Sequence, residues 1–171
     1  VYADLADQLT PVGIIPMHTP DEAIAELEFA TAELGLKAFM FGGPIQRPYP
    51  GQDPSTRLAR WIDTLGPDSP HDYDPVWTRC VELGVAPTFH SAATGWGSRT
   101  STTSYVWNHI GMFATAGEAM ARSLFLSGVP QRFPELRFAF LEGGVAWAAG
   151  LYSDLLGHWE KRNREAVEHY N

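Results

Sequence analysis

Several features that the sequence lacks narrow the class of protein. The 171 residues contain one cysteine, Cys80, so neither an intrachain disulfide nor a multi-cysteine zinc site can form, and a reducing, cytoplasmic setting is expected. No apolar run reaches the roughly 18 residues of a membrane span, which argues against a membrane protein. Basic residues are also few. Twelve Lys and Arg against 20 Asp and Glu give a net charge of −8, which disfavours a nucleic-acid surface.

Two groups of catalytic and binding motifs are missing as well. No G-x-G-x-x-G or G-x-x-x-x-G-K-[ST] loop follows a predicted strand, so nothing indicates a nucleotide site. No G-x-S-x-G elbow surrounds Ser91, which argues against a serine hydrolase. Cys80 falls on the apolar face of a predicted helix and is interpreted as a core residue, not a nucleophile. A globular protein with a small-molecule partner remains.

What the sequence does contain is an alternation of strand and helix patterns. Short apolar runs predict four strands, at 9–16, 36–41, 85–89 and 137–141. Periodic apolar residues predict four helices, at 19–35, 74–84, 115–128 and 147–159. Two T-x-x-E capping boxes, Thr19 to Glu22 and Thr115 to Glu118, mark the predicted starts of the first and third helices.

Strands that alternate with helices predict a parallel sheet and the α/β fold class. The sheet is either doubly wound, as in a flavodoxin-like binding domain with helices on both faces, or part of a (β/α)8 barrel. A complete barrel needs about 250 residues, so a barrel here would be partial. The long segments 42–72 and 91–111 both follow strand C-termini, which is where such folds build their sites.

Three side chains are the main candidates for chemistry. His90 directly follows the third strand and is a candidate metal ligand, or else a histidine bonded to a neighbouring strand. Glu142 holds the equivalent place after the fourth strand, where it is a ligand, a general base, a residue that orients His90, or a partner of an arginine. His109 lies in the long loop after His90 and is either a second proton carrier or a hydrogen-bonded loop residue.

The other histidines are given structural interpretations. His18 also follows a strand, but it precedes the Thr19 cap and is expected to support that turn. The remaining three are expected on the surface: His71, His158 and His169.

Three segments together carry a resemblance to a known family. They are 89–91 (Phe-His-Ser) with Gly95-Trp96, 127–138 (SGVPQRFPELRF), and 141–147 (LEGGVAW), of which 128–147 is the most specific. The chain resembles, over nearly its whole length, the amidohydrolase-related family that includes the aminocarboxymuconate-semialdehyde and resorcylate-type decarboxylases.

The resemblance implies a fold and a metal. It implies a partial (β/α)8 TIM barrel of about four consecutive βα units, strands three to six, with residues 1–171 as the central fragment of one barrel domain. A divalent metal, zinc or manganese, is held at the C-terminal mouth in this family, and His90 corresponds to its ligand on the fifth strand. Glu142 departs from the family pattern, which has a histidine there. The family's first-strand and last-strand ligands have no counterpart in the sequence.

The expected function is therefore that of a metal-dependent hydrolase, or of a non-oxidative decarboxylase of a small aromatic or unsaturated acid. Four aromatic residues are expected to line the pocket: Trp96, Tyr105, Trp107 and Phe113. The alternative is a barrel fragment without catalytic activity, because the sequence lacks some of the metal ligands that the family uses. Open sheet edges in such a fragment predict a homo-oligomer.

Overall fold

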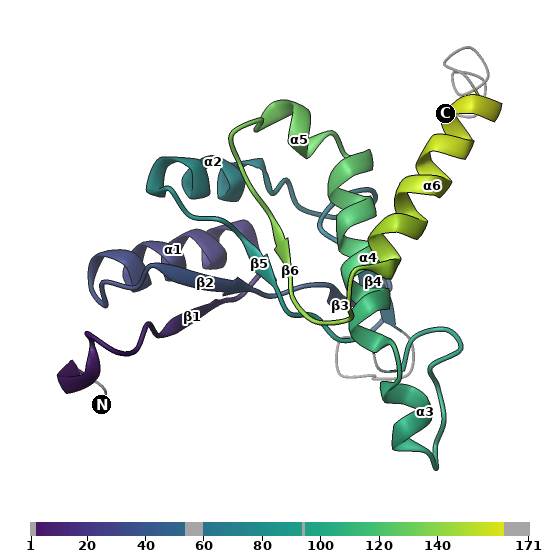
Figure 1. The fold of residues 1–171 in the computed structure, drawn as a ribbon, viewed down its shortest axis with the longest axis horizontal. Helices are drawn as coiled ribbons and strands as arrows, with labels where there is room; N and C mark the ends of the chain where they lie inside the picture. Colours follow the sequence, from purple (N-terminus) through teal and green to yellow (C-terminus); the bar gives the residue numbers. More distant parts are fainter. Residues whose placement is uncertain (1–2, 54–59, 94, 163–171) are drawn as a thin grey trace.

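The protein is built on one parallel sheet (Figure 1). The structure is a computed structural model and describes residues 3–53, 60–93 and 95–162. The sheet strands are β1 (Val12–Ile15), β2 (Ala38–Phe41), β5 (Thr88–Phe89) and β6 (Ala139–Phe140). The hairpin strands are β3 (Ile45–Pro48) and β4 (Arg60–Asp63). The helices are η1 (Ala3–Leu5), α1 (Pro20–Ala32), α2 (Asp74–Leu83), α3 (Tyr105–His109), α4 (Met112–Leu126), α5 (Val129–Arg132) and α6 (Ala146–Lys161).

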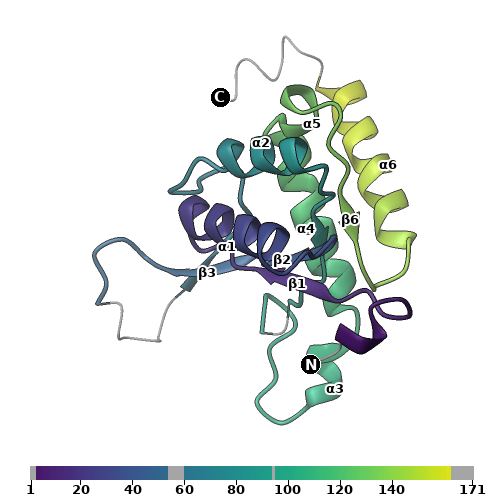
Figure 2. The same ribbon diagram turned by 90° about the vertical axis from the view of Figure 1, so that its left-hand side faces the viewer.

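The order of the sheet strands follows the order of the chain. It runs β1-β2-β5-β6 with every neighbouring pair parallel, which confirms the predicted α/β class. Figure 2 shows α1 and α2 on the same side of β1 and β2, as is expected when crossovers of one hand join successive parallel neighbours. Among the described strands the order never reverses, so this part of the sheet has no switch point of the kind that a doubly wound, flavodoxin-like domain contains.

The main core lies between the sheet and α1 and α2. Ile15, Phe41 and Phe89 from the strands and Leu27 and Trp77 from the helices are almost completely buried. Successive residues of a strand face opposite sides of a sheet, so Ile14 points away from this core and is 66% exposed. The second face of the sheet is thus apolar and open at β1.

Helices α1 and α2 form as their sequence signals predict. Thr19 caps α1 by accepting a hydrogen bond from the Glu22 backbone N–H at 3.3 Å, and its hydroxyl donates to the Glu22 carboxylate at 3.0 Å. Gly84 ends α2 in the left-handed conformation, with φ of 65°. Cys80 is buried within α2, and burial raises the pKa of its thiol to about 12. At neutral pH the thiol stays protonated, as the core interpretation requires.

The hairpin of β3 and β4 lies in segment 42–72, which the sequence predicted only as a long loop. Arg47 of β3 donates from Nε to the fully buried Asp63 of β4 at 2.5 Å, and from Nη2 to the Tyr73 hydroxyl at 2.9 Å and the His18 carbonyl at 3.0 Å. Tyr73 donates to the Met17 carbonyl at 2.6 Å. Burial raises the pKa of Tyr73 to about 12, so this hydroxyl keeps its proton. The network ties the hairpin to the end of β1.

The predicted start of α4 is wrong. The helix begins at Met112, with Gly111 as its N-cap in the left-handed conformation. Thr115, expected as a cap, lies inside the first turn, and its hydroxyl donates to the Gly111 carbonyl at 3.1 Å. A threonine can bond backward to a carbonyl within a helix, so the T-x-x-E pattern alone did not identify the helix start.

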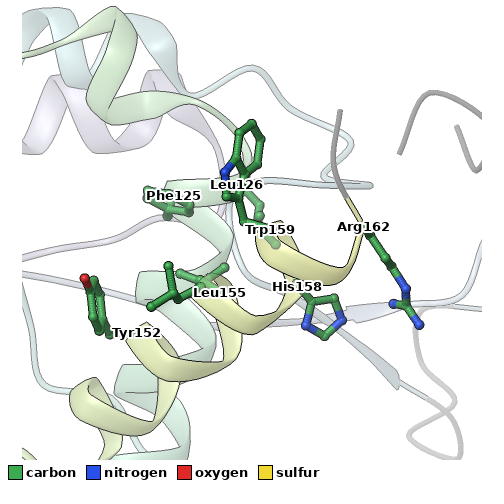
Figure 3. A pocket seen from close by; sticks show the side chains of 8 residues that line it. Phe125, Leu126, Tyr152, Leu155, His158, Trp159 and Arg162 are labelled. Carbon is green, nitrogen blue, oxygen red and sulfur yellow. The ribbon is translucent and has the colours of Figure 1, made fainter. Parts of the chain in front are cut away.

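The helical spacing of the apolar residues in the last predicted helix, 147–159, indicates an inward face, which the structure covers only in part: Trp147, Leu151 and Leu155 are half-buried. None of the described α6 side chains is buried, and Trp159 is 65% and Leu156 is 44% exposed. Within the described residues α6 packs mainly against α4, so a single neighbour covers one side of it. Between the two helices lies an apolar groove of about 530 Å³, seen in Figure 3 with Phe125, Leu126 and Tyr152 on its walls. Of the helices in the described residues, none is long and apolar enough to cross a membrane.

Candidate functional site

Two of the three candidate side chains meet at the C-terminal edge of the sheet. His90 follows β5 and Glu142 follows β6, and these strands are neighbours, paired through Phe89 and Phe140. The Leu141 N–H donates to the Phe89 carbonyl at 2.8 Å and extends the pairing to the site. The His90 Nε2 and the Glu142 Oε2 lie 2.7 Å apart, with 36% and 54% of the two side chains exposed. The pair is open to solvent on one side.

A tight turn sets the position of Glu142. Residues 142–144 all have positive φ, at 66°, 82° and 69°, a conformation that favours glycine and is strained at Glu142. Gly143 touches the first turn of α4, since a Cβ added to it would lie 2.5 Å from the Ala114 nitrogen. The turn is therefore pressed between the end of β6 and the start of α4.

This close approach makes Gly143 essential for the local geometry. Gly143→Ala should lower the free energy of unfolding by about 2–4 kcal/mol, because it combines left-handed strain with a clash against backbone. Gly144→Ala is the matched control, since Gly144 also has positive φ, at 69°, but no atom lies within 4 Å of the added Cβ. Gly144→Ala should lower the free energy of unfolding by about 1 kcal/mol. Urea unfolding of both variants measures the difference, and equal losses would rule out the clash.

The third candidate, His109, joins the cluster through a phenyl ring. Phe113, in the first turn of α4, makes an edge contact with His90 at 5.0 Å between ring centroids and another with His109 at 5.8 Å. The centroid of the Tyr105 ring also lies 5.0 Å from that of His109. His90 and His109 thus contact the same aromatic ring, that of Phe113.

The other described histidines lie outside this cluster. His18 is exposed, and its backbone carbonyl accepts the hydrogen bond from Arg47 described above. His71 packs its ring edge on Tyr73, and His158 lies on the exposed surface of α6. His169 lies outside the described residues. Of the predicted pocket aromatics, Trp107 is 62% exposed and donates from Nε1 to the Ser98 carbonyl at 2.7 Å.

Sequence reasoning missed the residue that organises the loop between these histidines. Arg99 donates from Nε to the Thr115 hydroxyl at 3.0 Å and from Nη1 to the Ile110 carbonyl. A second link inside this loop joins the Asn108 side chain to the Ser101 backbone, at 2.7 and 2.8 Å. No sequence signal would have identified Arg99, because its partners are a helix hydroxyl and a backbone carbonyl.

The donor set fits a divalent metal only in part. An imidazole nitrogen and a carboxylate oxygen at the end of neighbouring strands are ligand groups that zinc and manganese accept. A catalytic zinc site generally has three protein ligands. Among residues 3–53, 60–93 and 95–162, no group of three or more His, Cys, Asp or Glu side chains is arranged to hold a metal. The described residues can thus supply part of a metal site but not a complete one.

A parallel sheet in chain order, with polar side chains gathered at the C-terminal ends of its strands, is the arrangement of barrel-type α/β enzymes. The sequence model of the amidohydrolase family matches residues 2–170, and the chain belongs to that family. Members of this family generally use a divalent metal. None of the curated proteins compared with the chain matches it.

Solved structures agree with this assignment. An amidohydrolase from Mycobacterium avium subsp. paratuberculosis K-10 is 25% identical, with a TM-score of 0.60 over 87% of this chain and 36% of that one. A 2,6-dihydroxybenzoate decarboxylase from Rhizobium is 24% identical, with a TM-score of 0.55 over 80% of this chain and 39% of that one. A 2,6-dihydroxybenzoate decarboxylase in complex with 2,6-dihydroxybenzoate is also 24% identical, with a TM-score of 0.56 over 80% of this chain and 39% of that one. The chain spans less than two-fifths of these proteins.

Proposed function

We propose that this chain is part of a metal-dependent enzyme that either hydrolyses a C–N or C–O bond or decarboxylates a small aromatic or unsaturated acid. The observation that carries the proposal is the 2.7 Å contact between His90 and Glu142 at the ends of neighbouring strands. Parallel-stranded enzymes place their reacting groups at this edge. The family supports a divalent metal, and zinc or manganese suits these donors.

Each of the three side chains has a role in this proposal. His90 is a metal ligand, Glu142 orients its imidazole and takes part in proton transfer, and His109 is a second proton carrier beside Phe113. The bound metal would supply a Lewis acid, which polarises a carbonyl for hydrolysis or grips a carboxylate for decarboxylation. The exposed side of the His90 and Glu142 pair leaves room for a substrate to approach.

The matched region and its neighbours support a larger assembly. We propose that residues 1–171 are the central part of one barrel domain, contributing strands three to six, because the chain spans only 36–39% of its solved neighbours. We also propose a homo-oligomer. Apolar side chains exposed on β1 and α6, among them Ile14 at 66% and Trp159 at 65%, favour association.

A turnover screen tests the proposed function. The purified protein is assayed for CO₂ release from hydroxybenzoates and unsaturated acids, and for hydrolysis of amides and lactones, with added Zn²⁺ or Mn²⁺ and again with a chelator. Turnover that the chelator removes and the metal restores is the expected result. Metal-independent turnover would contradict the proposal. Stoichiometric binding of Zn²⁺ or Mn²⁺ without turnover would favour the alternative, a barrel fragment without catalytic activity.

A further inference from the structure

Arg99 links the segment after His90 to the junction that carries His109 and Phe113. Its backbone belongs to a tight turn, because the Arg99 N–H donates to the Trp96 carbonyl at 2.8 Å and the Gly95 N–H donates to the Arg99 carbonyl at 3.0 Å. Trp96 packs against a small core made by Ala93, Met112 and Ala116. The base of the Arg99 side chain thus lies in a turn that packs, through Trp96, on the small core at the start of α4.

The other end of the side chain spans the junction between α3 and α4. Nη1 donates to the Ile110 carbonyl, on the α3 side, and Nε donates at 3.0 Å to the Thr115 hydroxyl in α4. The guanidinium also lies over Gly111, since a Cβ added there would be 3.0 Å from Nη2. Both acceptors are neutral oxygens, so no ion pair is formed. The link depends on the planar guanidinium, which can donate to two acceptors at once.

This bridge holds the two rings that matter for the site. His109 immediately precedes the bonded carbonyl of Ile110, and Phe113 lies two residues before Thr115. The edge contact between His109 and Phe113 is 5.8 Å, and Phe113 in turn contacts His90 at 5.0 Å. Movement at the junction between α3 and α4 would therefore change the contact of His109 with Phe113, and with it the position of His109 relative to His90.

We propose that Arg99 is a positioning residue, whose two hydrogen bonds across the α3–α4 junction place His109 against Phe113, the ring that also contacts His90. The role of this placement in chemistry rests on the function proposed above, but the placement itself does not. The side-chain hydrogen bonds of Arg99 go to Ile110 and Thr115, and we assign it no contact with a reacting group. It acts through the backbone of Ile110 and the first turn of α4.

Imidazole NMR spectra of the metal-free protein test the placement. In the native protein the ring protons of His109 should carry the shifts that the Phe113 and Tyr105 rings induce, with cross-relaxation between His109 and Phe113. In Arg99→Ala and Arg99→Lys, these protons should move toward free-histidine positions and the cross-relaxation should be lost. Lysine keeps the charge but lacks the fork, so it should not rescue. The signals of His158, on α6, are the internal control and should not move.

Two variants of the acceptor keep the test valid if changes at Arg99 reduce folding. Thr115→Ser retains the hydroxyl and should leave the His109 signals in place, whereas Thr115→Val removes it and should shift them in the same direction as Arg99→Ala. Native His109 signals in folded Arg99→Ala would overturn the proposal, as would equal effects of the serine and valine variants. The NMR readout does not depend on turnover. The placement of His109 can therefore be tested whether or not the proposed function is correct.

Discussion

Replacing His90 by alanine is expected to weaken binding of Zn²⁺ or Mn²⁺ by about 100-fold or more. Loss of a residue that only supports a ligand typically costs 10–100-fold, so loss of the ligand itself should reach or exceed about that range. Metal titration of the purified protein by calorimetry measures the affinity. We expect His90 to be a ligand because its imidazole lies 2.7 Å from the Glu142 carboxylate, so that one metal ion could contact both groups.

Two further variants separate a ligand from a general effect on charge. His158→Ala removes an imidazole from the exposed surface of α6 and should leave the affinity unchanged. Glu142→Gln keeps the shape of the side chain but removes its charge, and should cost about tenfold or more. Native affinity in His90→Ala, or equal losses in the two histidine variants, would show that His90 is not the ligand.

Replacing Asp63 by alanine is expected to lower the free energy of unfolding by about 3–5 kcal/mol, the usual cost of breaking a buried ion pair by removing one partner. Asp63 is fully buried and accepts hydrogen bonds from Arg47 at 2.5 Å, Ser69 at 3.0 Å and the Leu65 N–H at 2.8 Å. The alanine leaves the Arg47 guanidinium, whose side chain is only 13% exposed, without its carboxylate. Urea denaturation gives the free energy.

A surface ion pair provides the comparison for this loss. Glu118 and Arg122 lie one turn apart on α4, with 26% and 52% of their side chains exposed. Glu118→Ala should cost no more than about 1 kcal/mol, because solvent screens an exposed pair. A loss of similar size in the two variants would mean that the network of Asp63 does not hold the hairpin.

Local sequence signals predicted the elements whose formation depends on local contacts. The capping box at Thr19, the end of the second helix at Gly84 and the helix face that carries Cys80 are all set by residues of one helix or its ends, and the structure contains each of them. Strand ends could also be located, which is why His90 and Glu142 were predicted at one edge of the sheet.

Features that depend on distant contacts could not be predicted. Asp63 and Arg47 pair across a hairpin whose strands are too short and polar to show a periodic pattern. Arg99 owes its position to a carbonyl and a hydroxyl that are 11 and 16 residues away. The apolar residues of α6 show a helical period, but a period does not reveal how much of the face a neighbouring element covers.

Paramagnetic Mn²⁺ tests most directly whether His90 and Glu142 belong to a metal site. Manganese broadens NMR signals close to it even when binding is weak, so the measurement needs no complete ligand set. Substoichiometric Mn²⁺ is added to the protein while the imidazole signals are recorded. We expect selective broadening at His90 and at the side chain of Glu142, with His18 and His158 unaffected. Broadening centred on another histidine, or none at His90, would contradict this assignment.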